Sequence, residues 1–251
     1  MATLTSPEAT SRRRVDDRPL FLIVAVAFPI FVFAGFARTF YLKPFIDAPP
    51  LPSYVVHLHG LAMTAWVALF IAQVWLVRAN KVKVHQQLGL AGIGVAIAVV
   101  IMTFFTSVAA AKYGSPSFPK EVPAISFAIM PLMDLVVFPS LFGAAMYYRK
   151  RSPANHKRLM LLTVLIFLPA PLARLPIIAS AASALGPGFF FGVPVLLAII
   201  TIVWDARRNG LNKVFAIAAA LWVLSIPLRI ALSGTTAWIN FATGLTRFAL
   251  T

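Results

Sequence analysis

The sequence contains no cysteine, and only 12% of its 251 residues are charged. The absence of cysteine excludes disulfides, thiolate metal sites and haem attached through thioether bonds. A soluble domain of this length carries roughly twice that charged fraction, so the chain has too few polar groups to cover a water-exposed surface. With 60% hydrophobic residues and a mean hydropathy of +0.88, we predict an integral membrane protein whose main partner is the lipid bilayer.

Acidic residues are also scarce, since seven stand against 22 lysines and arginines. The basic residues gather in short connections between apolar runs, which is typical of membrane topology and argues against nucleic-acid binding. The sequence has no glycine-rich phosphate loop, nucleophile elbow or H-E-x-x-H motif. Four histidines are too few for a membrane di-iron oxygenase, and the last apolar run has no lysine beyond Lys213 at its edge for a retinal Schiff base.

Seven apolar runs reach the length of about 20 residues that is needed to cross a hydrocarbon core. They are residues 20–41, 54–78, 87–111, 124–147, 159–182, 188–205 and 211–232. Prolines inside several runs predict kinks rather than breaks, because neighbouring helices can satisfy the freed carbonyl groups. We therefore predict an all-α, seven-helix membrane bundle.

The distribution of basic residues predicts the orientation. If the N-terminus is cytoplasmic, every inner connection is richer in Lys and Arg than every outer one. This predicts an N-in, C-out protein of the bacterial inner membrane. We expect a disordered cytoplasmic tail at 1–19, the helical domain at 20–234 and an amphipathic outer tail at 235–251. The first apolar run is too long for a signal-peptide core, so we expect it to be a retained span.

A hairpin pattern repeats three times along the chain. Each copy is an apolar run, a short basic loop and a polar entry into the next helix: VWLVRANKVKVHQQLGL, AAMYYRKRSPANHKRLML and ITIVWDARRNGLNKVFA. His85 and His156 occupy equivalent places in the first two copies, and Asn212 stands near that place in the third. The predicted architecture is one N-terminal helix followed by three helical hairpins.

His85 and His156 would both begin outward-running helices at the same depth on the cytoplasmic side. The partial positive charge of a helix N-terminus and the nearby basic side chains favour a neutral imidazole, which is the form that binds a metal. Two such residues at one level are candidate axial ligands of a b-type haem. The alternative is that both are interfacial residues that hydrogen-bond freed backbone N–H groups.

The stretch VHLHG places His57 and His59 near the outer end of the second run. Residues two apart on a helix diverge by roughly 200°, so both cannot point at one site. His59 shares a helix face with Trp66 and Phe70. Each histidine is a candidate metal ligand, and we expect one to face the bundle and the other an interface or the first span.

Asp134 is the only acidic residue well inside a predicted span. An ionised carboxylate near the bilayer centre is costly, which makes this residue a functional candidate. Its expected partners are the outer-half cations Arg38, Arg174 and Arg229, or His59, with which it would form an outer polar or metal site. The alternative is a buried ion pair that locks helix packing.

The motifs HLHGLAMTAWVALFIAQVWLV, HQQLGLAG, HKRLMLL, WDARRNG and IPLRIALSGTTAW, in this order, resemble an uncharacterised family of bacterial seven-span membrane proteins. The resemblance covers most of residues 53–240 and implies a fold but no function. The family often has a histidine about where Asn212 or Lys213 stands here, so this chain departs from it there. More distantly, basic loops closed by a histidine are similar to four-helix haem-b quinone or ferric reductases, which pair histidines on facing helices at both membrane depths.

Three functions agree with these residues. The first is a redox or metal-handling membrane protein that binds haem b or a transition metal through His85 and His156 and works with a redox partner or membrane complex. The second is a small-molecule or proton transporter that uses Asp134 and the outer arginines. The third is an accessory or assembly subunit without chemistry of its own. We favour the first, because a chain so poor in polar residues places four imidazoles at helix ends.

Overall fold

The structure is a computed structural model, and it describes residues 18–46, 53–115, 122–185 and 189–250. The predicted tail at 1–19 lies almost entirely outside the described residues. The regular structure within them is entirely helical, which confirms the predicted all-α class. The helices are α1 (Arg18–Phe36), α2 (Tyr54–Arg78), α3 (Val82–Tyr113), α4 (Ala124–Phe127), α5 (Ile129–Arg151), α6 (Pro153–Leu165), α7 (Pro169–Leu172), α8 (Pro176–Leu185), α9 (Phe189–Asn209), α10 (Lys213–Ser233) and α11 (Thr236–Leu245), with short π or 3-10 turns at Ala37–Tyr41, Lys43–Phe45 and Thr246–Phe248.

Among the described residues, five helical segments are long and apolar enough to cross a membrane. They are Pro19–Tyr41, Tyr54–Arg78, Val82–Tyr113, Ala124–Arg151 and Lys213–Ser233. Their outward faces carry large apolar side chains, such as Leu221 and Leu224 of α10, which are more than half exposed. A continuous apolar surface of this kind is stable against lipid and not against water. The five helices indicate a multi-pass membrane protein in a lipid bilayer.

The predicted run at 159–182 is not one helix. α6 ends at Leu165, α7 is a single turn and α8 begins only at Pro176. Pro169 and Pro171 cannot donate the backbone hydrogen bonds that would continue α6, and the chain closes tighter turns there instead, as between Leu168 N and Leu165 O at 3.1 Å. Each of four helices continues past an interior proline, namely Pro29 in α1, Pro139 in α5, Pro194 in α9 and Pro227 in α10. An isolated proline therefore leaves the helix continuous, whereas the closely spaced Pro169 and Pro171 interrupt it.

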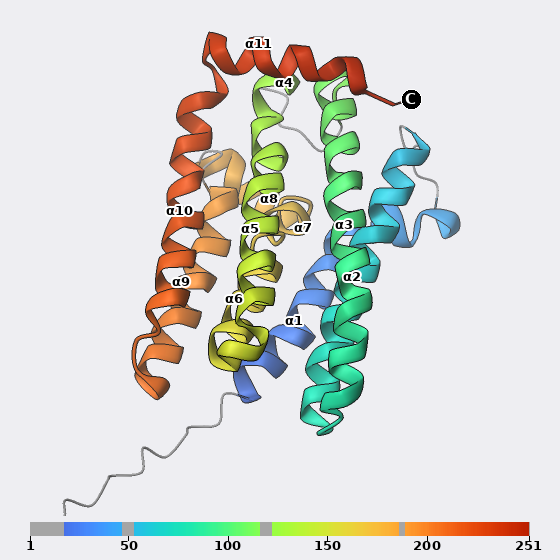
Figure 1. Ribbon diagram of the computed structural model, residues 1–251. Helices are drawn as coiled ribbons and strands as arrows, with labels where there is room; N and C mark the ends of the chain where they lie inside the picture. Colours follow the sequence, from blue (N-terminus) through green and yellow to red (C-terminus); the bar gives the residue numbers. More distant parts are fainter. Residues whose placement is uncertain (1–17, 47–52, 116–121, 186–188, 251) are drawn as a thin grey trace, which may run out of the picture.

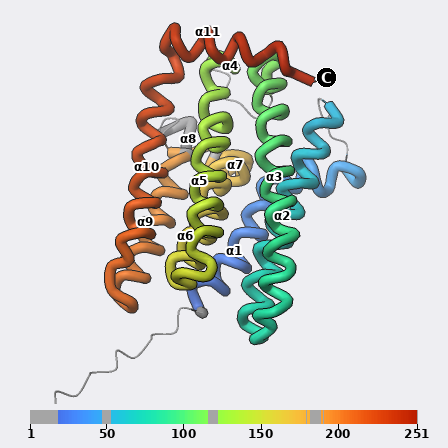
Figure 2. The backbone as a smooth tube through the Cα atoms, in the orientation of Figure 1, coloured from blue at the N-terminus to red at the C-terminus, as the bar shows by residue number. Residues whose placement is uncertain are grey.

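The hairpins α2–α3, α5–α6 and α9–α10 all turn at the same end of the bundle, where α1 begins (Figure 1). We call this the basic end, because its connections carry Arg78 and Lys81, Arg149, Lys150 and Arg151, and Arg207 and Arg208. Two of the turns use left-handed backbone, at Asn80 with φ 57° and Gly210 with φ 77°. At the opposite end, the α11 end, α11 runs across the bundle and packs against α3, α4 and α10 (Figure 2).

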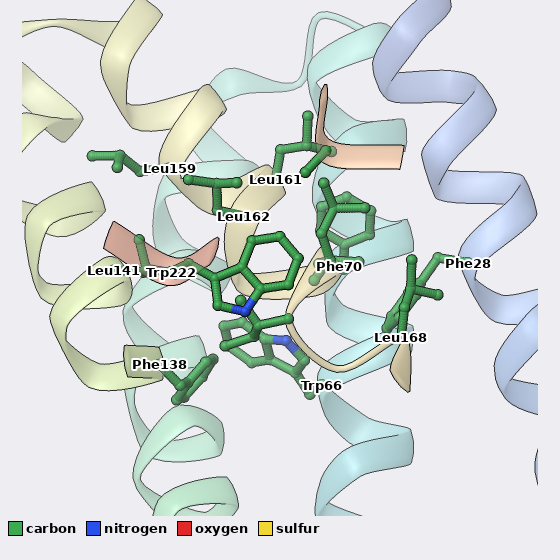
Figure 3. Close-up of a cluster of buried hydrophobic side chains, with 14 of the residues drawn as sticks. Phe28, Trp66, Phe70, Phe138, Leu141, Leu159, Leu161, Leu162, Leu168 and Trp222 are labelled. Carbon is green, nitrogen blue, oxygen red and sulfur yellow. The ribbon is translucent and has the colours of Figure 1, made fainter. Parts of the chain in front are cut away.

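Helix α6 lies at the centre of the apolar core. Leu161, Leu162 and Val164 are each fully buried although they point in different directions around the helix, as expected for a helix enclosed on all sides. The core around it includes Trp66 of α2 and Phe138 of α5, whose ring centroids are 5.1 Å apart in an edge-on contact (Figure 3). A central, enclosed α6 holds the polar residues of its first turns in fixed positions.

Backbone atoms of α1 and α7 approach each other closely at Gly35. A β-carbon at this position would collide with the carbonyl oxygen of Pro171, whereas a β-carbon at Gly94 in α3 would meet no atom within 4 Å. We expect Gly35→Ala to lower the free energy of unfolding by about 1–3 kcal/mol, because the two backbones must separate. The measurement is thermal unfolding of purified protein in detergent micelles, followed by circular dichroism.

The matched control for this prediction is Gly94→Ala. It introduces the same β-carbon into an open position of a helix, where alanine is favoured over glycine by about 0.5–1 kcal/mol. We therefore expect this variant to be as stable as the parent or slightly more stable. An equal loss of stability in both variants would contradict the close approach of α1 and α7.

Candidate functional site

The two histidines that the hairpin pattern equated lie close together at the basic end, with their rings edge-on. His85 lies in the first turn of α3 and His156 in the first turn of α6, and their ring centroids are 6.4 Å apart with an interplanar angle of 76°. Both residues are half-buried. The structure therefore brings together the pair that the sequence singled out, from helices that are far apart in the chain.

The hydrogen bonds of His85 and His156 determine which ring nitrogens remain free to bind a ligand. His156 Nδ1 lies 2.8 Å from the carbonyl oxygen of Ala145 in α5. A carbonyl only accepts, so Nδ1 carries the proton and Nε2 of the neutral ring keeps its lone pair. The His85 ring contacts the backbone of Gln73 in α2, while His85 Nδ1 and Gln73 Oε1 are buried without a hydrogen-bond partner. The pair thus offers nitrogen lone pairs and unpartnered polar atoms to a ligand.

The start of α6 is fixed by contacts with neighbouring helices. Ser152 caps α6 by accepting from Asn155 N at 3.4 Å. The Asn155 Oδ1 atom accepts from Asn212 Nδ2 at 2.7 Å, and Asn212 Oδ1 accepts from Phe215 N at 2.8 Å and so caps α10. Asn212, which the sequence placed near the position equivalent to the histidines, therefore lies against the residue that precedes His156.

A buried ion pair two residues beyond His156 was missed by the sequence reasoning. Arg158 of α6 donates from Nε to Oδ2 of Asp205 at 2.7 Å and from Nη2 to Oδ1 at 2.6 Å, and both side chains are about 95% buried. Asn209 adds a third hydrogen bond to this carboxylate at 3.0 Å. Asp205 stands next to Arg207 and Arg208 at the edge of its run, so in sequence it looked like part of a solvated basic loop.

At the α11 end, the structure pairs Asp134 with one of its three predicted arginines. Arg229 Nη1 of α10 donates to Asp134 Oδ1 of α5 at 2.7 Å and to the backbone oxygen of Met130 at 2.8 Å. The Arg229 side chain is only 3% exposed, and its Nε and Nη2 atoms are buried without a partner. The guanidinium group is therefore only partly satisfied by the protein.

The other predicted outer residues are not part of this ion pair. Arg38 is exposed on the turn that follows α1, and Arg174 lies over the ring of Phe36, 4.4 Å from its centroid. His57 is exposed near the start of α2, with Nδ1 3.3 Å from the backbone oxygen of Ser53. His59 is half-buried on the helix face that carries the core tryptophan, and its Nδ1 has no hydrogen-bond partner.

Within the part of the chain that the structure describes, no three His, Asp or Glu side chains come together in a group that could hold a metal ion. His57, His59 and Asp134, each considered as a metal ligand, do not form such a group. The physical reason is that Asp134 is engaged by Arg229 and that His57 points away from the bundle. The His85–His156 pair is a two-ligand site, which suffices only for a metal whose other ligands come from elsewhere.

Fold and site together define a helical, multi-pass membrane protein with a histidine pair at one end and a partly satisfied buried arginine at the other. Comparison of the chain with protein-family models, with curated proteins and with solved structures finds no match.

Proposed function

We propose that the protein binds a b-type haem between His85 and His156 and uses it for electron transfer or haem handling in the membrane. The observation that carries this proposal is the 6.4 Å separation of the two rings. Axial Fe–N bonds of about 2 Å each set the two ligating nitrogens roughly 4 Å apart and the ring centroids roughly 6 Å apart. The observed spacing agrees with an axial pair.

The hydrogen bonds of the pair support the same assignment. A histidine that ligates a metal usually donates its other N–H group to a carbonyl or carboxylate, as His156 does to Ala145. A porphyrin supplies four nitrogen ligands, so haem is the cofactor for which two histidines complete the coordination. The absence of cysteine from the sequence is consistent with a haem held without thioether bonds.

We further propose that the chain crosses the membrane seven times. We assign the broken segment α6–α8 to the fifth membrane pass and α9 to the sixth, which gives seven helical passes in the uncharacterised seven-span family that the motifs resemble. The gathering of basic connections at one end supports a cytoplasmic basic end in the bacterial inner membrane, with the N-terminus inside and α11 outside (Figure 1). A redox partner would then meet the haem from the cytoplasmic side.

The test is a haem titration of purified protein in detergent, followed by absorption spectroscopy. We expect one haem per chain and the spectrum of a low-spin, six-coordinate iron in the parent. His85→Ala and His156→Ala each remove one axial ligand, so we expect at least a tenfold loss of haem affinity or a change to a high-spin, five-coordinate spectrum.

His57→Ala is the matched control, because it removes an exposed imidazole at the far end of α2 and should leave the titration unchanged. Absence of a Soret band in the parent, together with no bound copper, zinc or iron by elemental analysis, would refute a redox or metal role. Unchanged haem binding in a variant that combines His85→Ala with His156→Ala would refute the assigned ligands.

A further inference from the structure

Arg229 presents an unfilled side of its guanidinium group inside the bundle. Its Nη1 atom satisfies Asp134 and Met130, but Nε and Nη2 are buried and have no partner. Leaving donors of a charged group unpaired away from water costs free energy. These two donors lie on one edge of the planar group, in the fork geometry that binds a carboxylate through two parallel hydrogen bonds.

Arg158, the second buried arginine among the described residues, shows what fills such an edge. In Arg158 the same two atoms, Nε and Nη2, donate to the two oxygens of Asp205 at 2.7 and 2.6 Å. Both arginines are almost fully buried, and both bridge the α5–α6 hairpin to the α9–α10 hairpin. Of these two arginines, Arg229 is the one whose Nε–Nη2 edge meets no carboxylate among the described residues.

We infer that the free edge of Arg229 is a binding site for a small monocarboxylate. The buried hydroxyl of Ser225 in α10 already donates to the backbone oxygen of Trp222. Nearby buried apolar residues include Ile129 and Leu132 of α5 and Ile226 of α10. They suit the aliphatic part of such an acid, and they disfavour a strongly hydrated dianion such as phosphate. The ion pair lies about 6–8 Å below the ends of its helices at the α11 end. The Asp134 side chain is 20% exposed, so the pair is not fully enclosed by the protein.

Charge balance adds a proton to this binding step. Arg229 and Asp134 neutralise each other, so an incoming carboxylate would leave a net negative charge in an apolar site unless Asp134 takes up a proton. Arg229 is the charged group that faces Asp134. Three other described helices pack against α5. Helix α4 has no ionisable side chain, and the ionisable side chains of α6 lie at the basic end. In α3, Lys112 lies over the Tyr113 ring. The carboxylate therefore binds together with one proton, which is placed on Asp134.

The test measures binding of radiolabelled butyrate to purified protein in detergent, with excess unlabelled ligand to define the specific fraction. We expect saturable binding of one butyrate per chain, with affinity that increases as the pH falls. Unlabelled 1-butanol has the same chain without the carboxylate and should not compete, and inorganic phosphate should compete at least tenfold less well than butyrate. These ligand comparisons use the parent protein, so they do not depend on the folding of any variant.

Arg229→Lys keeps the positive charge beside Asp134 but lacks the forked edge, so we expect at least tenfold weaker butyrate binding. Arg247→Lys is the matched control, because Arg247 is exposed at the same end of the molecule. This variant should bind butyrate as strongly as the parent. Asp134→Asn should bind butyrate with an affinity that no longer depends on pH. No saturable butyrate binding, equal binding by Arg229→Lys and parent, or stronger competition by phosphate would each overturn the inference. His85 lies at the opposite end of the bundle, so the His85→Ala variant should bind butyrate as the parent does. The butyrate result therefore does not depend on whether the protein binds haem.

Discussion

Asp205→Ala is expected to lower the free energy of unfolding by about 3–5 kcal/mol. The reason is the partner that it leaves behind. Without the carboxylate, the buried Arg158 guanidinium loses its two short hydrogen bonds to Asp205 and keeps the bond from Nη1 to the backbone oxygen of Ala154 at 2.9 Å. An uncompensated charge then remains in an apolar interior. Thermal unfolding in detergent micelles measures the loss.

A double substitution separates the unpaired charge from the worth of the pair itself. In Arg158→Met with Asp205→Leu no charge is left unpaired, so most of the lost stability should return. Arg207→Ala, an exposed neighbour of Asp205, should change stability by no more than about 0.5 kcal/mol. If the double variant were as unstable as Asp205→Ala, the unpaired charge would not be the cause.

Trp66→Ala is expected to cost about 3–5 kcal/mol, because it empties the largest buried position in the core. The Trp66 side chain is 1% exposed, and its ring packs edge-on against Phe138, with the centroids 5.1 Å apart (Figure 3). A second edge-on contact joins it to Phe142, whose centroid is 5.7 Å away. Membrane helices gain little from the hydrophobic effect against lipid, so close packing of this kind holds them together. The measurement is again thermal unfolding in micelles.

Two further tryptophan variants make this prediction specific. Trp66→Phe should cost less than about 1.5 kcal/mol, because it keeps most of the ring volume and removes an indole N–H that has no partner. Trp75→Ala, on the same helix but 62% exposed, should change stability by no more than about 0.5 kcal/mol. Equal losses in Trp66→Ala and Trp75→Ala would show that the core contact does not stabilise the fold.

The helical class and the presence of several membrane-compatible apolar helices could be predicted from the sequence, because about 20 apolar residues between basic loops leave few alternatives in a bilayer. The break in the segment that follows Leu165 could not be predicted in the same way. Whether a proline kinks or ends a membrane helix depends on its spacing from the next proline and on the neighbours that accept the freed carbonyls. Pro169 and Pro171 end α6, while the isolated Pro139 leaves α5 continuous.

The candidate sites show a similar division. The equivalent positions of His85 and His156 in two hairpins predicted their common depth, and the structure places their rings 6.4 Å apart. Position in the run also singled out Asp134, but three arginines were equally good partners, and only the packing of α10 against α5 selects Arg229. Asp205 was overlooked because charge counts along a sequence cannot distinguish a carboxylate that turns inward from one in a solvated loop.

The two ion pairs have a mechanical consequence. Arg158–Asp205 and Asp134–Arg229 fasten the α5–α6 hairpin to the α9–α10 hairpin at opposite ends, so these four helices should move as one rigid block. The α2–α3 hairpin lies beside this block, and His85 and His156 stand on either side of the seam between them. Movement of the α2–α3 hairpin relative to this block would change the distance between the two imidazoles directly. A group bound between the imidazoles would therefore restrict that movement.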